Sequence, residues 1–141
     1  MSHKKFDPSR AERLIAAERY QELKPDIILQ KLGIRSGNTI LDLGCGNGFF
    51  TFPAAVAMGE GMVIAADMSE DMLSLLRQRN TPDNIQILHV EEVKMDVEDD
   101  SVEAAVLIAV YHEFKNPMEN LAEIKRTLKP GGKILILDWD P

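Results

Sequence analysis

Residues 39–50 read TILDLGCGNGFF, and the rest of the chain is organised around this segment. It opens with a mostly apolar run, which is typical of a parallel strand that is buried on both faces. Glycine then occupies every second position, at Gly44, Gly46 and Gly48. Because glycine adopts positive φ angles and lets a ligand approach the main chain, this run predicts a turn that faces a small molecule. Residues 49–58, FFTFPAAVAM, predict a helix, so we expect a ligand site at the carboxyl end of the strand.

The glycine spacing distinguishes between ligands. A dinucleotide-binding loop reads G-x-G-x-x-G, and its third glycine lets the helix pack closely on the strand. The spacing here is G-x-G-x-G, and Phe49 occupies the place of that third glycine. A bulky ring at this point argues against a pyrophosphate lying tightly on the helix N-terminus.

The loop resembles the first motif of the class I, Rossmann-like S-adenosylmethionine-dependent methyltransferases, in which an acidic residue precedes G-x-G-x-G. Asp42 is that acid in this chain. The resemblance implies that this segment helps to bind S-adenosyl-L-methionine, through Asp42, Gly44, Cys45, Gly46 and Gly48. Cys45 is the single cysteine and cannot form an internal disulfide, which fits a reducing compartment. We interpret it as a small apolar loop residue in preference to a nucleophile.

Length and charge narrow the class of protein further. The 141 residues suit one domain that buries roughly 68% of its unfolded surface. The sequence contains no apolar run that could span a bilayer and no signal segment, so we expect a soluble, cytoplasmic protein. Residues 1–40 carry eight Lys/Arg against five Asp/Glu, whereas residues 41–141 carry eight against eighteen. Because nucleic-acid enzymes usually present a basic face, this balance favours a small-molecule substrate over DNA or RNA.

A second acidic position follows the next predicted strand. Residues 61–67, GMVIAAD, read as a buried strand that ends in Asp67. A carboxylate at this place can accept hydrogen bonds from both hydroxyls of a ribose that is held on the first loop. NAD-dependent enzymes share this feature, so Asp67 indicates a ribose and not a particular cofactor. The resemblance implies that the next residue, Met68, packs on the adenine; an ordinary core methionine is an equally good interpretation.

An acidic segment follows the third predicted strand, residues 84–90. Residues 91–103 read EEVKMDVEDDSVE, and a solvated loop accounts for most of these charges. The resemblance places Glu91 at the position that receives the adenine amino group, and Glu92 at the next position, whose main-chain N–H meets the ring. The related enzymes usually carry Asp-Ala there, so Glu-Glu is a departure from their pattern.

The fourth predicted strand, residues 102–110, leads into the expected catalytic side of the pocket. The resemblance implies that the main chain near Ile108 and Ala109 faces the amino group of the cofactor. Tyr111 and His112 follow directly and are the catalytic candidates. A histidine titrates near pH 6.5 and can remove a proton from a nucleophile; His112 can equally hold the loop through a main-chain bond. One histidine among scattered carboxylates does not predict a metal site.

The N-terminal region is expected to cover the site. Within one domain, residues 1–36 form a predicted helical arm or lid, and residues 37–141 form the predicted core that binds S-adenosylmethionine. A helix in this arm starts at Pro25 and ends at Gly33. The resemblance implies that the arm folds across the cofactor, with Phe6 and Tyr20 as lid residues. The alternative is that both rings simply cover the sheet.

The last segment fixes the predicted topology. Asn116 and Pro117 start a helix that ends at residues 130–132, and residues 133–139, KILILDW, form a fifth strand. We therefore expect an α/β fold, a doubly wound and mostly parallel Rossmann-like sheet of order 3-2-1-4-5. LKPGGKILI, residues 128–136, is common in the resembled family. That family continues with an antiparallel hairpin that this chain is expected to lack, which would expose the fifth strand as an edge for a homodimer.

These features predict an S-adenosylmethionine-dependent methyltransferase. It would act on a small molecule by direct in-line transfer and release S-adenosyl-L-homocysteine. A cofactor-binding module without catalysis, or a partner-dependent subunit, is the first alternative, because the expected lack of the hairpin leaves the substrate pocket incomplete. An NAD-dependent oxidoreductase would share the glycines and Asp67, but Phe49 and the LKPGGKILI segment argue against it.

Overall fold

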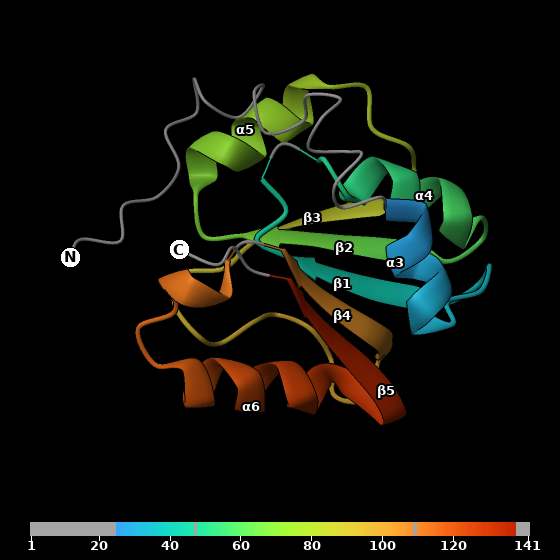
Figure 1. Cartoon of the computed structure of the whole chain (residues 1–141). Helices are drawn as coiled ribbons and strands as arrows, with labels where there is room; N and C mark the ends of the chain where they lie inside the picture. Colours follow the sequence, from blue (N-terminus) through green and yellow to red (C-terminus); the bar gives the residue numbers. More distant parts are fainter. Residues whose placement is uncertain (1–24, 47, 109, 138–141) are drawn as a thin grey trace.

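The computed structural model describes residues 25–46, 48–108 and 110–137 of the chain. They form one parallel sheet with helices on both faces (Figure 1). The sheet order is β3-β2-β1-β4-β5, and every neighbouring pair is parallel. This confirms the predicted α/β, Rossmann-like topology. The strands are β1 Thr39–Leu43, β2 Met62–Asp67, β3 Ile85–His89, β4 Val102–Ile108 and β5 Leu128–Leu137.

Local sequence signals mark one end of each of three helices. Ser69 caps its helix, because its side chain accepts the N–H of Met72 at 3.2 Å. Gly33, at φ +66°, follows the first described helix, and Pro117 stands in the first turn of the last one. The helices are α3 Pro25–Leu32, α4 Thr51–Met58, α5 Glu70–Gln78, the 3-10 turn η2 Tyr111–Glu113 and α6 Pro117–Thr127.

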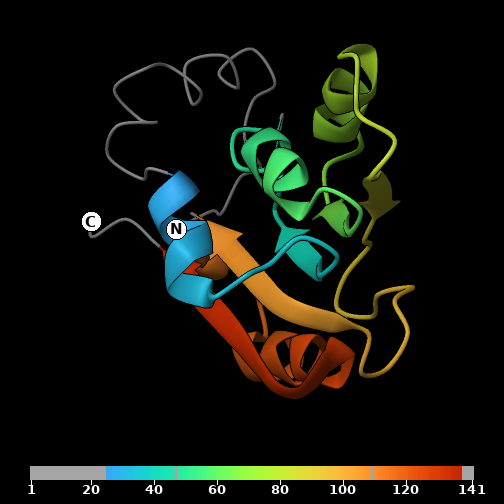
Figure 2. The same cartoon turned by 90° about the vertical axis from the view of Figure 1, so that its right-hand side faces the viewer.

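The central strand is buried on both faces. Leu41 and Leu43 pack with Ile124 of α6 on one side of the sheet. Ile40 packs with Met58 of α4 on the other side. Figure 2 shows α6 beneath β4 and β5, with α4 and α5 on the opposite side. The apolar run in β1 therefore reflects its place in the middle of a three-layer structure.

The α3 helix belongs to this core. Its Ile28, Leu29 and Leu32 are buried in the cluster that contains Ile40 and Met58. Phe6 and Tyr20, the predicted lid residues, lie outside the described residues, and the division at residue 36 stays a prediction.

In the part of the chain that the structure covers, no helix is both long enough and apolar enough to cross a membrane.

Some predicted boundaries are wrong by a few residues. The helix after the glycine turn begins at Thr51 and not at Phe49. The last helix ends at Thr127, and β5 begins at Leu128 and not at Lys133. The strand accommodates residues 129–132 because its register with β4 shifts there. Proline is tolerated on an edge strand or at a bulge, so Pro130 and the glycines after it interrupt the pairing without ending the strand.

Candidate cofactor site

The turn after β1 lies over the end of β2. The main-chain N–H groups of Gly44 and Cys45 both donate to the carbonyl of Ala66, at 2.7 and 3.0 Å. Gly44 has φ +81°, and a Cβ built on it would lie 2.7 Å from the Cβ of Val110. Only glycine therefore fits at this position, between the end of β2 and the segment that follows β4. Gly46 and Gly48 also have positive φ, at +57° and +99°.

Asp67 joins the glycine turn to the end of β2. One carboxylate oxygen accepts the N–H of Gly46 at 2.8 Å, and the other accepts the N–H of Ser69 at 2.8 Å. The side chain is half-buried at the carboxyl end of its strand. Each carboxylate oxygen can accept more than one hydrogen bond, so Asp67 has the capacity to receive ribose hydroxyls as well.

Asp42 is buried below the turn. Its side chain is only 2% exposed, and its carboxylate accepts the hydroxyl of Thr51 at 2.6 Å. Burial raises the pKa of Asp42 to about 7; the Thr51 hydrogen bond acts against this rise, and the charge of Asp67 adds to it. Asp42 thus connects β1 to the first turn of α4. Thr51 was missed by sequence reasoning, although a hydroxyl at the start of a helix that follows a strand-end acid is a recognisable signal.

Cys45 is buried in the turn. Its thiol donates to the carbonyl of Gly46 at 3.6 Å. Burial raises the pKa of the thiol well above its ordinary value, and the charges of Asp42 and Asp67 raise it further. A neutral thiol is a poor nucleophile, so this environment agrees with the interpretation of Cys45 as a small apolar loop residue.

The ends of β2 and β3 meet beside Asp67. The N–H of Val90 donates to the main-chain carbonyl of Asp67 at 3.0 Å. Met68 is half-buried and packs on the core cluster that contains Val90. Glu91 and Glu92 come next and are exposed. The structure thus brings these residues to the same edge of the sheet as the glycine turn, while their contacts with adenine stay predictions.

The segment after β4 forms the other wall. Ile108 is half-buried against the cluster of α3 and α4. Tyr111 makes an edge-to-face contact with Phe114, with ring centroids 5.8 Å apart. Ala109 and the side chain of His112 lie outside what the structure describes, so the catalytic roles of Tyr111 and His112 stay predictions. Among the described side chains, no group of three or more His, Cys, Asp or Glu could hold a metal ion.

At the carboxyl ends of the parallel strands lie the glycine turn, Asp67, which is bonded to it, and the loop that carries Glu91 and Glu92. Positive φ at three glycines and the bond between Gly46 and Asp67 fit an adenosine-containing ligand at this edge of the sheet. This arrangement defines a Rossmann-like α/β domain whose glycine turn and Asp67 lie at the carboxyl edge of the sheet. Residues 41–136 match a family described as a methyltransferase domain, and the chain belongs to that family.

Individual relatives agree with the family. Demethylmenaquinone methyltransferase of Clavibacter sepedonicus is 36% identical over 105 residues, which are 74% of this chain and 42% of that protein. Demethylmenaquinone methyltransferase of Staphylococcus aureus (strain JH9) is 28% identical over 137 residues, which are 96% of this chain and 56% of that protein. The chain therefore spans about half the length of the curated relatives that it matches.

A solved structure gives the same result. The crystal structure of a SAM-dependent methyltransferase from Aquifex aeolicus has a TM-score of 0.89 and 31% identity, and the match covers 96% of this chain and 74% of that one. The resemblance to class I, Rossmann-like S-adenosylmethionine-dependent methyltransferases is thereby confirmed.

Proposed function

We propose that this chain binds S-adenosyl-L-methionine and transfers its methyl group to a small-molecule nucleophile. The observation that carries the proposal is the hydrogen bond between Gly46 and Asp67, which joins the turn that would face the sulfonium to the acid that would hold the ribose. The family to which the chain belongs and the solved methyltransferase structure support this reading.

The proposed mechanism needs little chemistry from the protein. When bound, the cofactor supplies a methyl group that is electrophilic without further activation. Asp67 would accept the ribose hydroxyls, and Glu91 and the main chain of Glu92 would meet the adenine. A main-chain carbonyl near Ile108 or Ala109 would accept a hydrogen bond from the amino group of the cofactor. The chain would then align the acceptor with the carbon–sulfur bond and exclude water from the reacting atoms. Orientation and desolvation would therefore supply the catalysis.

Two further residues would act on the acceptor. His112 would take the proton that an oxygen, nitrogen or carbon acceptor loses, because a histidine titrates close to neutral pH. Tyr111, beside it in η2, would help to position the acceptor. Phe6 and Tyr20 would close the pocket as lid residues.

The acceptor class follows from charge and from the relatives. The net charge of −7 disfavours nucleic acid as the acceptor, which agrees with a small-molecule acceptor. The relatives named demethylmenaquinone methyltransferase make a hydroquinone the first acceptor to test.

The free buried thiol of Cys45 suits a reducing compartment such as the cytoplasm.

An assay with labelled methyl groups tests the proposal. The chain is incubated with methyl-labelled S-adenosylmethionine and a panel of phenol, hydroquinone, amine and thiol acceptors. Label in an acceptor and release of S-adenosylhomocysteine are the expected result. Cofactor binding without transfer to any acceptor would favour the alternative, a cofactor-binding module or a partner-dependent subunit.

Self-association is a further part of the proposal. In the described sheet β5 pairs with β4 alone, and Ile136 on this strand is 40% exposed. A long apolar strand at a sheet edge offers unpaired main-chain groups to another chain. We therefore propose a homodimer that forms through β5.

A further inference from the structure

A short loop lies between two buried anchors beside the candidate adenine site. Val90 is 2% exposed, and its N–H is bonded to the carbonyl of Asp67. Met95 is 3% exposed and packs in the same core cluster. The four residues between them, 91–94, include the two glutamates that are predicted to meet adenine. The position of Met95 therefore controls where this loop can lie.

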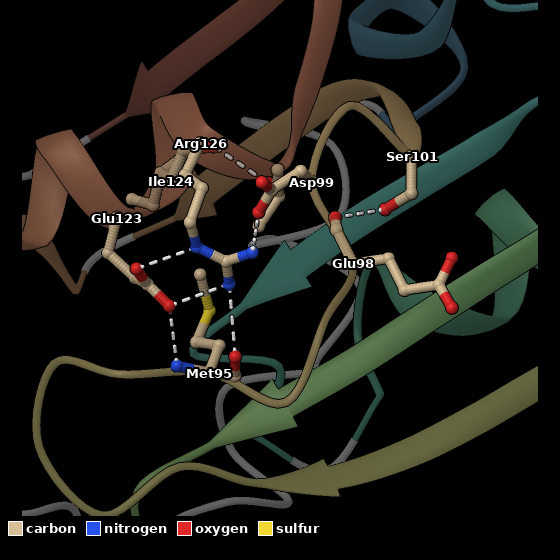
Figure 3. Close-up of polar contacts among 8 residues, drawn as sticks. Met95, Glu98, Asp99, Ser101, Glu123, Ile124 and Arg126 are labelled. Carbon is tan, nitrogen blue, oxygen red and sulfur yellow. Dashed lines mark hydrogen bonds and ion pairs between the residues drawn. The ribbon is translucent and has the colours of Figure 1, made fainter.

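Both main-chain polar groups of Met95 are bound by side chains of α6 (Figure 3). The N–H of Met95 donates to the carboxylate of Glu123 at 2.7 Å. The Nη2 of Arg126 donates to the carbonyl of Met95 at 3.1 Å. A helix far along the sequence thus holds a single loop residue from both sides.

The two holding side chains also fix each other. Arg126 donates to both carboxylate oxygens of Glu123, at 2.9 and 2.8 Å, and to Asp99 at 2.6 Å. The side chain of Glu123 is only 13% exposed and that of Arg126 is 32% exposed. The guanidinium lowers the pKa of Glu123, which keeps this carboxylate charged at neutral pH. A two-point pair of arginine and carboxylate has a fixed geometry that a lysine could not reproduce.

The C-terminal end of α6 also binds this segment through main-chain hydrogen bonds. The N–H of Asp100 donates to the carbonyl of Arg126 at 3.0 Å, and the N–H of Ser101 donates to the carbonyl of Thr127 at 2.7 Å. The short stretch 91–94 thus lies between two fixed residues, Val90 and Met95. Fixing the main chain of a residue costs conformational entropy, so a loop that is already ordered loses less entropy when a ligand binds.

We infer that Glu123 and Arg126 are positioning residues for the nucleoside end of the cofactor site. They hold Met95 so that residues 91 and 92 stand ready to meet the adenine. This inference rests on the proposed function, because it takes the adenosyl group as the ligand. Neither side chain touches the ligand in this account; both act through the loop.

The test compares Arg126→Met with a matched control, Lys129→Met. The control likewise removes one cation. It breaks the ion pair between Lys129 and Glu103 at 2.6 Å, which joins β5 to β4, whereas Arg126→Met breaks the two ion pairs with Glu123 and Asp99. Hydrogen exchange of the Met95 amide is measured in the ligand-free protein. Affinity for S-adenosylhomocysteine and for adenosine is measured by calorimetry.

We expect Arg126→Met to speed exchange at Met95 and to weaken both ligands by about tenfold, which corresponds to the loss of one good hydrogen bond. Lys129→Met should leave both measurements within about twofold of the wild-type values. Arg126→Lys keeps the charge but cannot form the two-point pair with Glu123, so both of its measured values should fall between those of the wild type and Arg126→Met. This variant replaces Arg126→Met if Arg126→Met does not fold.

Two results would overturn the inference: unchanged exchange at Met95 in the Arg126 variants, or faster exchange with unchanged affinity. The wild-type affinity decides the proposed function, whereas the ratio of variant to wild-type affinity decides this inference. The two failures can therefore be told apart.

Discussion

The main-chain N–H of Gly46 donates to the carboxylate of Asp67 at 2.8 Å, across 21 residues of sequence. The turn after β1 and the end of β2 therefore form one unit. A change in the acid alters the turn, and a change in the turn alters the acid. The predictions below separate the contributions of these elements.

Asp67→Asn should weaken binding of S-adenosylhomocysteine by about 10–100-fold. The substitution removes charge-assisted hydrogen bonds, each worth about 1.5–3 kcal/mol, while it keeps the size of the side chain. Calorimetric titration measures the change. Asp83→Asn, at an exposed position away from the turn, is the matched control and should bind as the wild type does. Equal affinities in the two variants would show that Asp67 does not hold the ligand.

Gly44→Ala should destabilise the fold more than Gly37→Ala. Both glycines have positive φ, which costs an L-residue roughly 1–2 kcal/mol. A Cβ at Gly37 meets nothing within 4 Å, whereas a Cβ at Gly44 overlaps the side chain of Val110. Overpacking adds about 1–3 kcal/mol, so urea unfolding should show a larger loss for Gly44→Ala. Equal losses would mean that the Val110 segment moves freely away from the turn.

Asp42 should give the stability an unusual dependence on pH. Its pKa in the folded protein is about 7, whereas an unfolded aspartate titrates near 3.9. Between these values the folded protein binds a proton that the unfolded chain does not. The contribution of Asp42 to the free energy of unfolding is therefore full below about pH 4 and is lost as the pH rises through about 7. Among the described residues, the titratable groups whose charges interact with Asp42 are Asp67, which raises its pKa, and Cys45, whose own pKa is raised well above its ordinary value.

Three variants test this dependence by urea unfolding between pH 5 and pH 8. Asp42→Asn should abolish the part of the decline that Asp42 causes, so the advantage of the wild type over this variant should be larger at pH 5 than at pH 8. Thr51→Val removes the hydrogen bond that lowers the pKa of Asp42 and should extend the decline to higher pH. Thr51→Ser keeps the hydroxyl and should restore the wild-type curve. Parallel curves for wild type and Asp42→Asn would contradict the assignment.

Self-association through β5 should depend on Ile136. Sedimentation velocity of the wild type at rising concentration should show a dimer, and Ile136→Lys should remove it, because a lysine on an edge strand opposes pairing with another strand. Val56→Lys, on α4 at an 80% exposed position, is the control and should dimerise as the wild type does. A wild type that stays monomeric at high concentration would exclude this interface.

The sequence predicts the strands and the glycine turn because their signals are local. The buried run of β1, the glycines after it and the cap at Ser69 each depend on residues within a few positions of one another. The register shift that lets β5 begin at Leu128 depends instead on its pairing with β4, so propensity alone placed that boundary at Lys133.

Long-range polar contacts were also beyond sequence reasoning. The acidic segment after β3 reads as a solvated loop, yet Asp99 and Met95 in it are bound by Arg126 of α6. Arg126 lies in the last turn of α6, where the helix dipole favours a cation, and its side chain also binds the loop. Such pairs appear only when the fold brings distant segments together.

Calorimetric titration of the whole chain with S-adenosylmethionine, S-adenosylhomocysteine and NAD compares the three candidate ligands at this site. We expect saturable binding of the first two ligands and none of NAD. Binding of NAD alone, or of none of the three, would contradict the claim that the turn after β1 and the carboxylate of Asp67 together hold an adenosyl sulfonium.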